Sequence, residues 1–304
     1  MILCAGEALI DMIPNADGEY VPHVGGSVLN TAAALGRLGE DVALITGLSS
    51  DPFGALIEER MTSSHVATTH AVRSARNTTL AFVHLDQGDA TYTFYDDETA
   101  TRTIQPSDIP PVPDNAQAMF FGCISLCNPP VADTLLHLAM SQPADRLIML
   151  DVNVRPGFAV DETTYRARLS RLMSRANIVK LSTDDIAWLI PEGDLEAKAR
   201  AAQDMTPGML LLTEGGAGAT AIMPDNRSVR VAAQSVEVVD TVGAGDTFNA
   251  GCLAALRRAD ALSPAAIDTL DEATITDMLT LATRAAAITV SRAGANPPWA
   301  NELD

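Results

Sequence analysis

Short apolar runs alternate along the chain with longer segments whose apolar residues recur at helical spacing. The first pairs are Ile2 to Cys4 with Val28 to Leu38, Val42 to Thr46 with Phe53 to Met61, and Met119 to Phe121 with Val131 to Met140. The same alternation continues through Leu147 to Val152, a helix around Tyr165 to Met173, Ile178 to Leu181, a short helix at Asp184 to Leu189, and Met209 to Thr213. This pattern predicts an α/β fold in which helices cover a mainly parallel central sheet.

One region departs from this alternation. Thr79 to Leu85 and Thr91 to Tyr95 are rich in β-forming residues, and Asp86-Gln87-Gly88-Asp89 between them has a composition suited to a hairpin turn. The proline-rich stretch Pro106 to Asp114 could be a domain linker, but βα alternation lies on both sides of it. We therefore predict one domain over residues 1–304, with a β-rich flap beside the main sheet.

Composition and charge exclude several classes of protein. The chain has 304 residues, 47% of them hydrophobic, which is enough for a full core. Its formal net charge of −19 argues against a nucleic-acid partner, because such partners are bound mainly through Lys and Arg. The four cysteines lie in apolar stretches without a zinc-binding spacing, so reduced core thiols are expected. No basic leader or run of about 18 apolar residues occurs, which predicts a cytoplasmic protein with no membrane partner.

The strongest chemical signal is the segment Asp240-Thr241-Val242-Gly243-Ala244-Gly245-Asp246-Thr247-Phe248. It follows a predicted strand at Val236 to Val239 and opens a predicted helix at Phe248 to Leu256. Gly243 and Gly245 allow close approach of a ligand to the backbone, and the first turn of a helix presents free N–H groups and a positive dipole end. The segment therefore predicts a phosphate site.

Asp246 stands at the start of that helix. The helix dipole is expected to keep its carboxylate ionised, so that it can take a proton from an attacking hydroxyl as a general base. The alternative is an aspartate that merely caps the helix, which is the common role of a lone aspartate before an apolar run. The flanking glycines favour the catalytic interpretation.

Two further glycine clusters are candidate ligand sites. The first, Gly25-Gly26-Ser27-Val28-Leu29-Asn30, offers a bare backbone at Gly26 and an amide at Asn30. Together with Asp11, which can accept hydrogen bonds from vicinal hydroxyls, it suits a neutral polyol, although Asp11 and Asn30 are equally compatible with loop caps. The second, Leu211 to Gly218, ends a predicted strand at the sheet edge where open α/β folds bind ligands, or is simply a hairpin turn.

Other nucleotide-binding patterns are missing from the sequence. There is no Walker sequence ending in Gly-Lys-Ser/Thr, and no G-x-G-x-x-G follows the first strand. A P-loop NTPase and a nicotinamide-dependent Rossmann enzyme are therefore disfavoured.

The motifs as a set resemble the ribokinase/PfkB family of carbohydrate kinases. Asp240 to Phe248 is similar to the family's C-terminal signature and Gly25 to Gly39 to its N-terminal one. The stretches most similar to bacterial fructokinases are Gly6-Glu7-Ala8-Leu9-Ile10-Asp11, Asn77 to Val83, and Asp151-Val152-Asn153-Val154-Arg155-Pro156. The resemblance implies a ribokinase-like three-layer α/β/α domain whose small β-sheet lid comes from about 12–24 and 77–103, and ATP-dependent phosphorylation of a sugar hydroxyl.

The resemblance also implies roles for individual residues. Asp246 would be the base, and the backbone N–H groups of Gly243, Ala244 and Gly245 would form an anion hole. The sugar would be held by Asp11, Gly25, Gly26 and Asn30, with Arg155 near the substrate or a phosphate. ATP would be bound by Lys180, Ser182, Thr213, Gly215, Gly216 and Gly218.

Metal ions are implied by the same resemblance. The family uses Mg²⁺ with ATP, commonly through an Asn-x-x-Glu motif, and the matching residues are Ser182-Thr183-Asp184-Asp185. Asp185, a shorter side chain than Glu, would act on Mg²⁺ through water. Many members also bind K⁺ or another monovalent cation, and the matching loop is Asp240 and Val242 with the backbone of 292–294.

Fructose is the preferred substrate, and 2-keto-3-deoxygluconate is the main alternative. Kinases for that sugar acid typically carry an arginine soon after the flap tyrosine, whereas Tyr95 is followed by Asp96-Asp97-Glu98. Carboxylates near the substrate would repel an acid, so the flap favours a neutral sugar, unless these side chains simply face solvent. Nucleoside kinases are disfavoured because only 4% of residues are aromatic.

Two further predictions concern whether the protein is an enzyme and whether it forms a dimer. A non-catalytic sugar-binding regulatory protein with this fold is the alternative from another class, against which the intact Asp246 region argues. An exposed β flap also suits a homodimer formed through the lid.

Overall fold

A central sheet lies between two hydrophobic cores of the molecule. The computed structural model of the chain describes residues 1–86 and 89–303. Nine strands of this described part form the sheet: β1 (Ile2–Ala5), β4 (Val42–Ile45), β6 (Val66–Ala67), β10 (Ala118–Gly122), β11 (Leu147–Asp151), β12 (Ile178–Ser182), β13 (Met209–Thr213), β14 (Ala219–Ile222) and β15 (Ser228–Val231). Their order is β15-β14-β13-β12-β11-β10-β1-β4-β6, and only the pairs that involve β14 and β15 are antiparallel.

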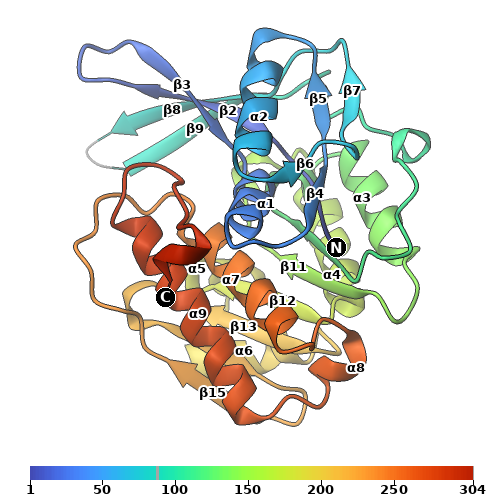
Figure 1. The fold of residues 1–304 in the computed structure, drawn as a ribbon, viewed down its shortest axis with the longest axis vertical. Helices are drawn as coiled ribbons and strands as arrows, with labels where there is room; N and C mark the ends of the chain where they lie inside the picture. The colour runs from blue at the N-terminus through green and yellow to red at the C-terminus, as the bar shows by residue number, and fades with distance from the viewer. Residues whose placement is uncertain (87–88, 304) are drawn as a thin grey trace.

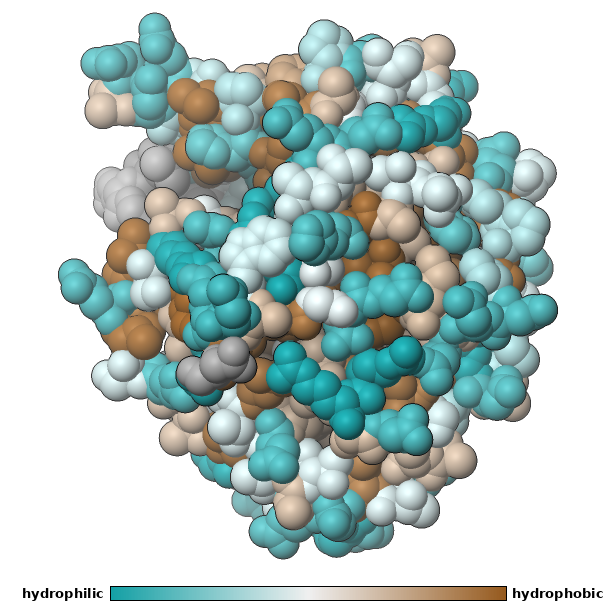
Figure 2. Space-filling model, in the orientation of Figure 1, coloured by the Kyte–Doolittle hydropathy of each residue, from teal (hydrophilic) through white to brown (hydrophobic). Residues whose placement is uncertain are grey.

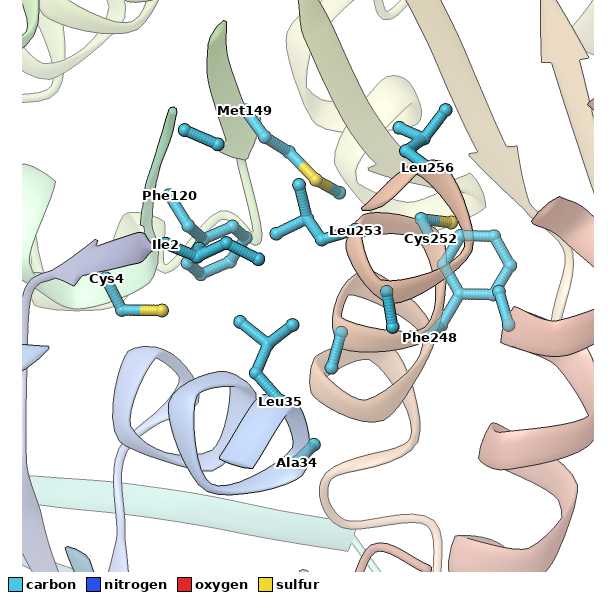
Figure 3. Close-up of a cluster of buried hydrophobic side chains, with 14 of the residues drawn as sticks. Ile2, Cys4, Ala34, Leu35, Phe120, Met149, Phe248, Cys252, Leu253 and Leu256 are labelled. Carbon is cyan, nitrogen blue, oxygen red and sulfur yellow. The ribbon is translucent and has the colours of Figure 1, made fainter. Parts of the chain in front are cut away.

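Helices cover both faces of this sheet. One face packs against α1 (Ser27–Arg37), α2 (Pro52–Ser63), α7 (Ala244–Arg258), α8 (Pro264–Ile267) and α9 (Glu272–Val290). The other face packs against α3 (Val131–Met140), α4 (Glu162–Arg175), α5 (Thr183–Leu189) and α6 (Leu195–Gln203). Successive strand residues such as Met149 and Leu150 enter opposite cores, as the period of a strand requires. The predicted three-layer α/β/α architecture is confirmed, and Figure 3 shows the first core, where Met149 and Phe120 face Leu253.

A second, smaller sheet projects from the body of the molecule (Figure 1). Its strands are β2 (Leu9–Pro14), β3 (Tyr20–Gly25), β8 (Leu80–Asp86) and β9 (Asp89–Tyr95), in the order β3-β2-β8-β9. We call these four strands the small sheet. The predicted flap strands are confirmed as β8 and β9, and residues 87–88 of the predicted turn lie outside the described residues. A separate two-stranded pair joins β5 (Gly47–Ser49) to β7 (Val72–Ser74).

One predicted strand is wrong. Residues 236–239 form a loop that leaves β15 and runs to the start of α7. The side chains of Val238 and Val239 are 60% and 59% exposed, and Val239 donates its backbone N–H to the carbonyl of Val290 at the end of α9 rather than to a strand. The valine-rich sequence favours a strand, but strands need a neighbour to pair with, and this segment has left the sheet.

The surface is mostly polar on the face that Figure 2 shows, with apolar residues in scattered patches. All four cysteines are buried free thiols, as expected. In residues 1–86 and 89–303, no helix has the length and apolar character needed to cross a membrane.

Candidate active site

A cavity of about 910 Å³ brings together most of the residues singled out from the sequence. The predicted residues on its wall are Asp11, Gly26, Asn30, Arg155, Lys180, Ser182, Thr213, Gly215, Gly216, Gly218, Val242, Gly243, Ala244, Gly245 and Asp246. Gly25, Asp185 and Asp240 do not line it. The cavity lies where β11, β12 and β13 end, the position at which open α/β sheets bind their ligands.

Asp246 occupies the third position of α7, whose N-cap is Gly243 in the left-handed conformation (φ 78°). Its carboxylate accepts hydrogen bonds from Ser27 Oγ at 2.6 Å and Asn30 Nδ2 at 2.9 Å, both on α1. Helix α7 has no side-chain cap, so capping does not account for this aspartate. The glycine turn at 243–245 and the glycine cluster at 25–30, both singled out from the sequence, therefore meet at one carboxylate.

Burial has the largest effect on the pKa of Asp246. The residue is only 7% exposed, and burial raises its pKa above the ordinary value, against the lowering effect of the bonds from Ser27 and Asn30. A carboxylate with a raised pKa holds a transferred proton more readily, which suits a general base.

Asp11 marks a second part of the cavity. Burial, helped by the negative charge of Asp246, raises its pKa to about 6. A Cβ at position 25 would lie 2.0 Å from Asp11 Oδ2, so Gly25 makes room for this carboxylate although it does not line the cavity. Gly26 has a φ of 105° and approaches the carbonyl of Glu7 too closely for a side chain, which explains why a glycine stands there.

Sequence reasoning missed a polar chain that leads to Asp246. Arg155 Nη1 donates to Asn153 Oδ1 at 2.7 Å, and Asn153 Nδ2 donates to Ser27 Oγ at 3.1 Å. Ser27 in turn donates to Asp246. Ser27 and Asn153 both lie inside motifs that the sequence singled out, so their position was a signal, but their contact joins segments 126 residues apart.

Glu7 was also missed as a member of the site. It follows β1, lines the cavity and is 2% exposed. Its carboxylate accepts hydrogen bonds from Ser125 Oγ at 2.6 Å and from the backbone N–H of Val28 at 3.3 Å, while burial raises its pKa to about 7. The signal in the sequence was a carboxylate two residues after a fully apolar strand.

Lys180 lines the cavity beside the start of α7 and forms a buried ion pair with Asp151, which does not line the cavity. Lys180 on β12 is 4% exposed, and its Nζ lies 3.2 Å from Asp151 Oδ1 on β11. The same Nζ lies 3.3 Å from the place where a Cβ would stand at Gly245, so the ammonium group borders the first turn of α7. Burial raises the pKa of Asp151 to about 6, although the charge of Lys180 lowers it.

Asp185 is occupied by contacts within the protein. Its oxygens accept hydrogen bonds from the backbone N–H of Val154 and from the N–H and Oγ of Ser182, each at 2.7 Å. The neighbouring carboxylate, Asp184, lines the cavity instead. Of the described residues, no group of three or more His, Cys, Asp or Glu side chains is arranged to hold a metal ion. A metal here would therefore depend on phosphate and water for most of its ligands, which is usual for Mg²⁺.

Asp240 ties two loops together. Its Oδ1 accepts from the backbone N–H of Val242 at 3.0 Å, and its Oδ2 accepts from that of Gly294 at 2.8 Å. The segments named for a monovalent cation are thus adjacent in the fold.

The acidic residues after Tyr95 do not line the cavity, so they give no electrostatic reason for a neutral sugar. Asp96 pairs with Arg102 at 3.1 Å and Glu98 pairs with Arg76, and neither they nor the exposed Asp97 line the cavity. The flap contributes Tyr92 and Phe94 to the cavity wall, and the charged groups of that wall near Tyr92 include both Asp11 and Arg155. The acidic residues after Tyr95 therefore do not bear on the substrate.

Comparison with known proteins places this site in a family. The profile of the pfkB family of carbohydrate kinases matches residues 1–302. The chain belongs to the pfkB family. A fructokinase from Rhizobium leguminosarum bv. trifolii is 41% identical to this pfkB kinase over 276 residues, which cover 90% of this chain and 84% of that protein.

Solved structures agree with this assignment. A fructokinase from Xylella fastidiosa with bound ATP superimposes on the pfkB kinase with a TM-score of 0.89 and 27% identity, covering 99% of this chain and 96% of that one. A fructokinase from Vibrio cholerae O395 with fructose, ADP and a calcium ion gives a TM-score of 0.84 and 26% identity, covering 97% and 94%. The protein is thus an ATP-dependent sugar kinase with the ribokinase-like fold.

Proposed function

We propose that this kinase is a fructokinase that transfers the γ-phosphoryl group of ATP to a hydroxyl of fructose, with Asp246 as the general base. The observation that carries the proposal is the place of the Asp246 carboxylate, which shares the cavity with Asp11 on one side and with Lys180 and the start of α7 on the other. The choice of fructose is supported by the names of the relatives, not by the charge of the flap.

The geometry suggests how the transfer proceeds. The attacking hydroxyl gives its proton to Asp246 while the γ-phosphoryl group leaves ADP. Gly243, Ala244 and Gly245 line the cavity at the start of α7, where the N–H of Ala244 also donates to the carbonyl of Thr241 at 3.3 Å. Their backbone N–H groups would stabilise the transferring charge together with Lys180. Asp11, Gly26 and Asn30 would hold the sugar, and Asn30 also fixes the base because it donates to Asp246.

The nucleotide and its ions would occupy the other end. Ser182, Thr213 and the glycines of 215–218 line that end and would hold ATP. Mg²⁺ bound to ATP would neutralise charge on its phosphates. Asp185 as a residue that acts on Mg²⁺ through water, and a monovalent cation at Asp240 and Val242, remain predictions.

The test is an ADP-release assay with ATP, Mg²⁺ and one of four acceptors: fructose, 2-keto-3-deoxygluconate, ribose or adenosine. We expect turnover with fructose and a loss of at least about 100-fold in kcat for Asp246→Asn, because a positioned base contributes that much or more. Calorimetry should show that the variant still binds fructose. Asp97→Asn, which changes an exposed aspartate outside the cavity, is the matched control and should keep its activity.

A sugar-acid kinase is the second candidate, and Arg155 is the observation that favours it. This guanidinium is the arginine on the cavity wall among the described residues, and a carboxylate substrate needs such a partner. If 2-keto-3-deoxygluconate is the better substrate and Arg155→Met reverses that preference, the fructokinase proposal is overturned. Turnover with none of the four acceptors would instead favour a sugar-binding protein without activity.

A further inference from the structure

On the neighbouring strands β11 and β12, buried apolar residues give way to charged residues at the same position in the sheet register. On β11 and β12, Met149 and Ile178 belong to the core that also contains Leu253 of α7. Figure 3 shows Met149 close to Leu253 in this core. Two residues further along each strand, and so on the same face, stand Asp151 and Lys180, which are direct partners in the parallel register. A buried ion pair therefore lies on top of the core at the end of the sheet.

One face of helix α7 also changes from apolar to polar residues beside this ion pair. Leu253 is in the core, Asn249 lies one turn earlier and Asp246 nearly one turn before that, so all three share one face of the helix. Asn249 and Asp151 are both 0% exposed. The face of α7 that carries the base thus continues, through Asn249, onto the ion pair.

Hydrogen bonds link Asn249 to Asp151 and Asp151 to Lys180. Asn249 Nδ2 donates to Asp151 Oδ2 at 2.7 Å, while Lys180 Nζ donates to Oδ1 at 3.2 Å and lies 3.4 Å from Oδ2. Within the described residues, Asn249 Oδ1 is buried without a hydrogen-bond partner, so the amide serves here only as a donor to Asp151. Asn249 therefore orients the carboxylate, and the carboxylate holds the ammonium group.

We propose that Asp151, oriented by Asn249, is a positioning residue that keeps the Lys180 ammonium group charged and fixed beside the first turn of α7, ready for the phosphates of ATP. The inference rests on the proposed function for the placement of Lys180 next to those phosphates. A buried lysine without a counter-ion tends to lose its proton, and a neutral amine cannot stabilise the charge of the transferring group. Asp151 does not touch the substrates in this arrangement and acts through Lys180.

The charges around Lys180 give the sign of the pH effect. Burial works to lower the pKa of Lys180, but Asp151, then Asp185 and Asp246, raise it above the ordinary value. The other ionisable groups near this cluster are the buried thiol of Cys252 on α7 and Arg155 after β11. Because Asp151 is the nearest carboxylate, replacing it with a neutral residue should move the deprotonation of Lys180 to lower pH.

The experiment is a double-mutant cycle with Asp151→Asn, Lys180→Met and the pair together. We expect each single variant to lose about tenfold or more in kcat/KM for ATP, and the double variant to be no worse than Lys180→Met, since residues that act as one unit are not additive. In Asp151→Asn the alkaline limb of the rate profile should move to lower pH. Asp133→Asn is the control, because the Asp133 side chain is largely exposed and pairs with Arg168. This variant should change neither kcat/KM for ATP nor the alkaline limb.

Three outcomes separate the possible failures. If Asp151→Asn lowers activity equally with and without Lys180, or leaves the alkaline limb in place, the positioning role is overturned. If Lys180→Met retains full activity, the placement of Lys180 by the phosphates fails, whereas loss of fructose turnover in the unmodified enzyme would refute the proposed function itself. Should Asp151→Asn not fold, as judged by circular dichroism, Asn249→Ala supplies the same cycle, with a smaller expected loss and the same lack of additivity.

Discussion

At the scale of the residue, Gly243 shows how little room the start of α7 allows for a side chain. It is the N-cap of α7 with a φ of 78°, and a Cβ there would lie 2.8 Å from the Cβ of Ala295. Any side chain would be strained by the backbone conformation and would also displace the segment around Ala295 or the first turn of α7. Because that turn carries the N–H groups of the proposed anion hole, the displacement should affect the reaction.

Gly243→Ala should therefore lose both stability and activity. We expect about 1 to 2 kcal/mol less free energy of unfolding from the left-handed backbone alone, and a fall in kcat of about tenfold or more from the displaced N–H groups. Gly39→Ala is the matched control, since Gly39 has a φ of 88° and no atom within 4 Å of its Cβ position. Chemical denaturation and the ADP-release assay measure the two effects; an equal fall in kcat for both variants would contradict the argument.

At the scale of the element, the segment 294–297 links helices to the catalytic turn. Arg60 of α2 donates to the carbonyl of Ala295 at 2.7 Å, and Arg37 of α1 donates to Asn296 Oδ1 at 2.7 Å and to the carbonyl of Pro297 at 2.8 Å. The same segment contacts Gly243 and donates from Gly294 to Asp240. Two arginines thus fix the loop against which the start of α7 rests.

Arg60→Met should loosen this loop. Removing a charged donor to a partly buried carbonyl should cost about 1.5 to 3 kcal/mol of unfolding free energy, and the poorer support of α7 should lower kcat. Arg73→Met, which breaks the exposed pair of Arg73 with Glu58 of α2, is the control and should cost less than about 1 kcal/mol. Thermal and urea unfolding and the kinase assay compare the two variants. Similar losses of stability and kcat in both would show that the hydrogen bond from Arg60 to Ala295 does not support the start of α7.

The sequence predicts an element well when the evidence for it lies within that segment, and poorly when the element depends on contacts with distant segments. Hydrophobic periodicity located the strands and helices of the α/β/α layers, because each buries one face along its own length. It failed at 236–239, where β-branched residues indicated a strand but the segment has no strand to pair with. The pairing of Asp151 with Lys180 was not predictable in the same way, since it needs β11 and β12 to be neighbours in the sheet.

At the scale of the whole molecule, the small sheet stands over the cavity with two different faces. Tyr92 and Phe94 of β9 line the cavity, whereas Tyr95 points to the opposite face, where its ring packs on Phe82 with centroids 5.3 Å apart. We propose that this sheet is the lid predicted from the sequence, closing over bound sugar and excluding water. A homodimer formed through it remains a prediction.

If the small sheet excludes water, then removing an aromatic side chain from its inner face should let water compete with the sugar for the phosphoryl group. Tyr92→Ala should raise the ratio of ADP released to sugar phosphate formed, and should lower kcat/KM for fructose by about tenfold. Tyr95→Ala changes the same residue type on the same strand but on the outer face, where the side chain is 61% exposed, so its ratio should stay near one. Measuring both products in one reaction separates these cases. If Tyr95→Ala leaks as much as Tyr92→Ala, loss of sheet stability explains the effect, and if neither leaks, the small sheet is not the barrier to water.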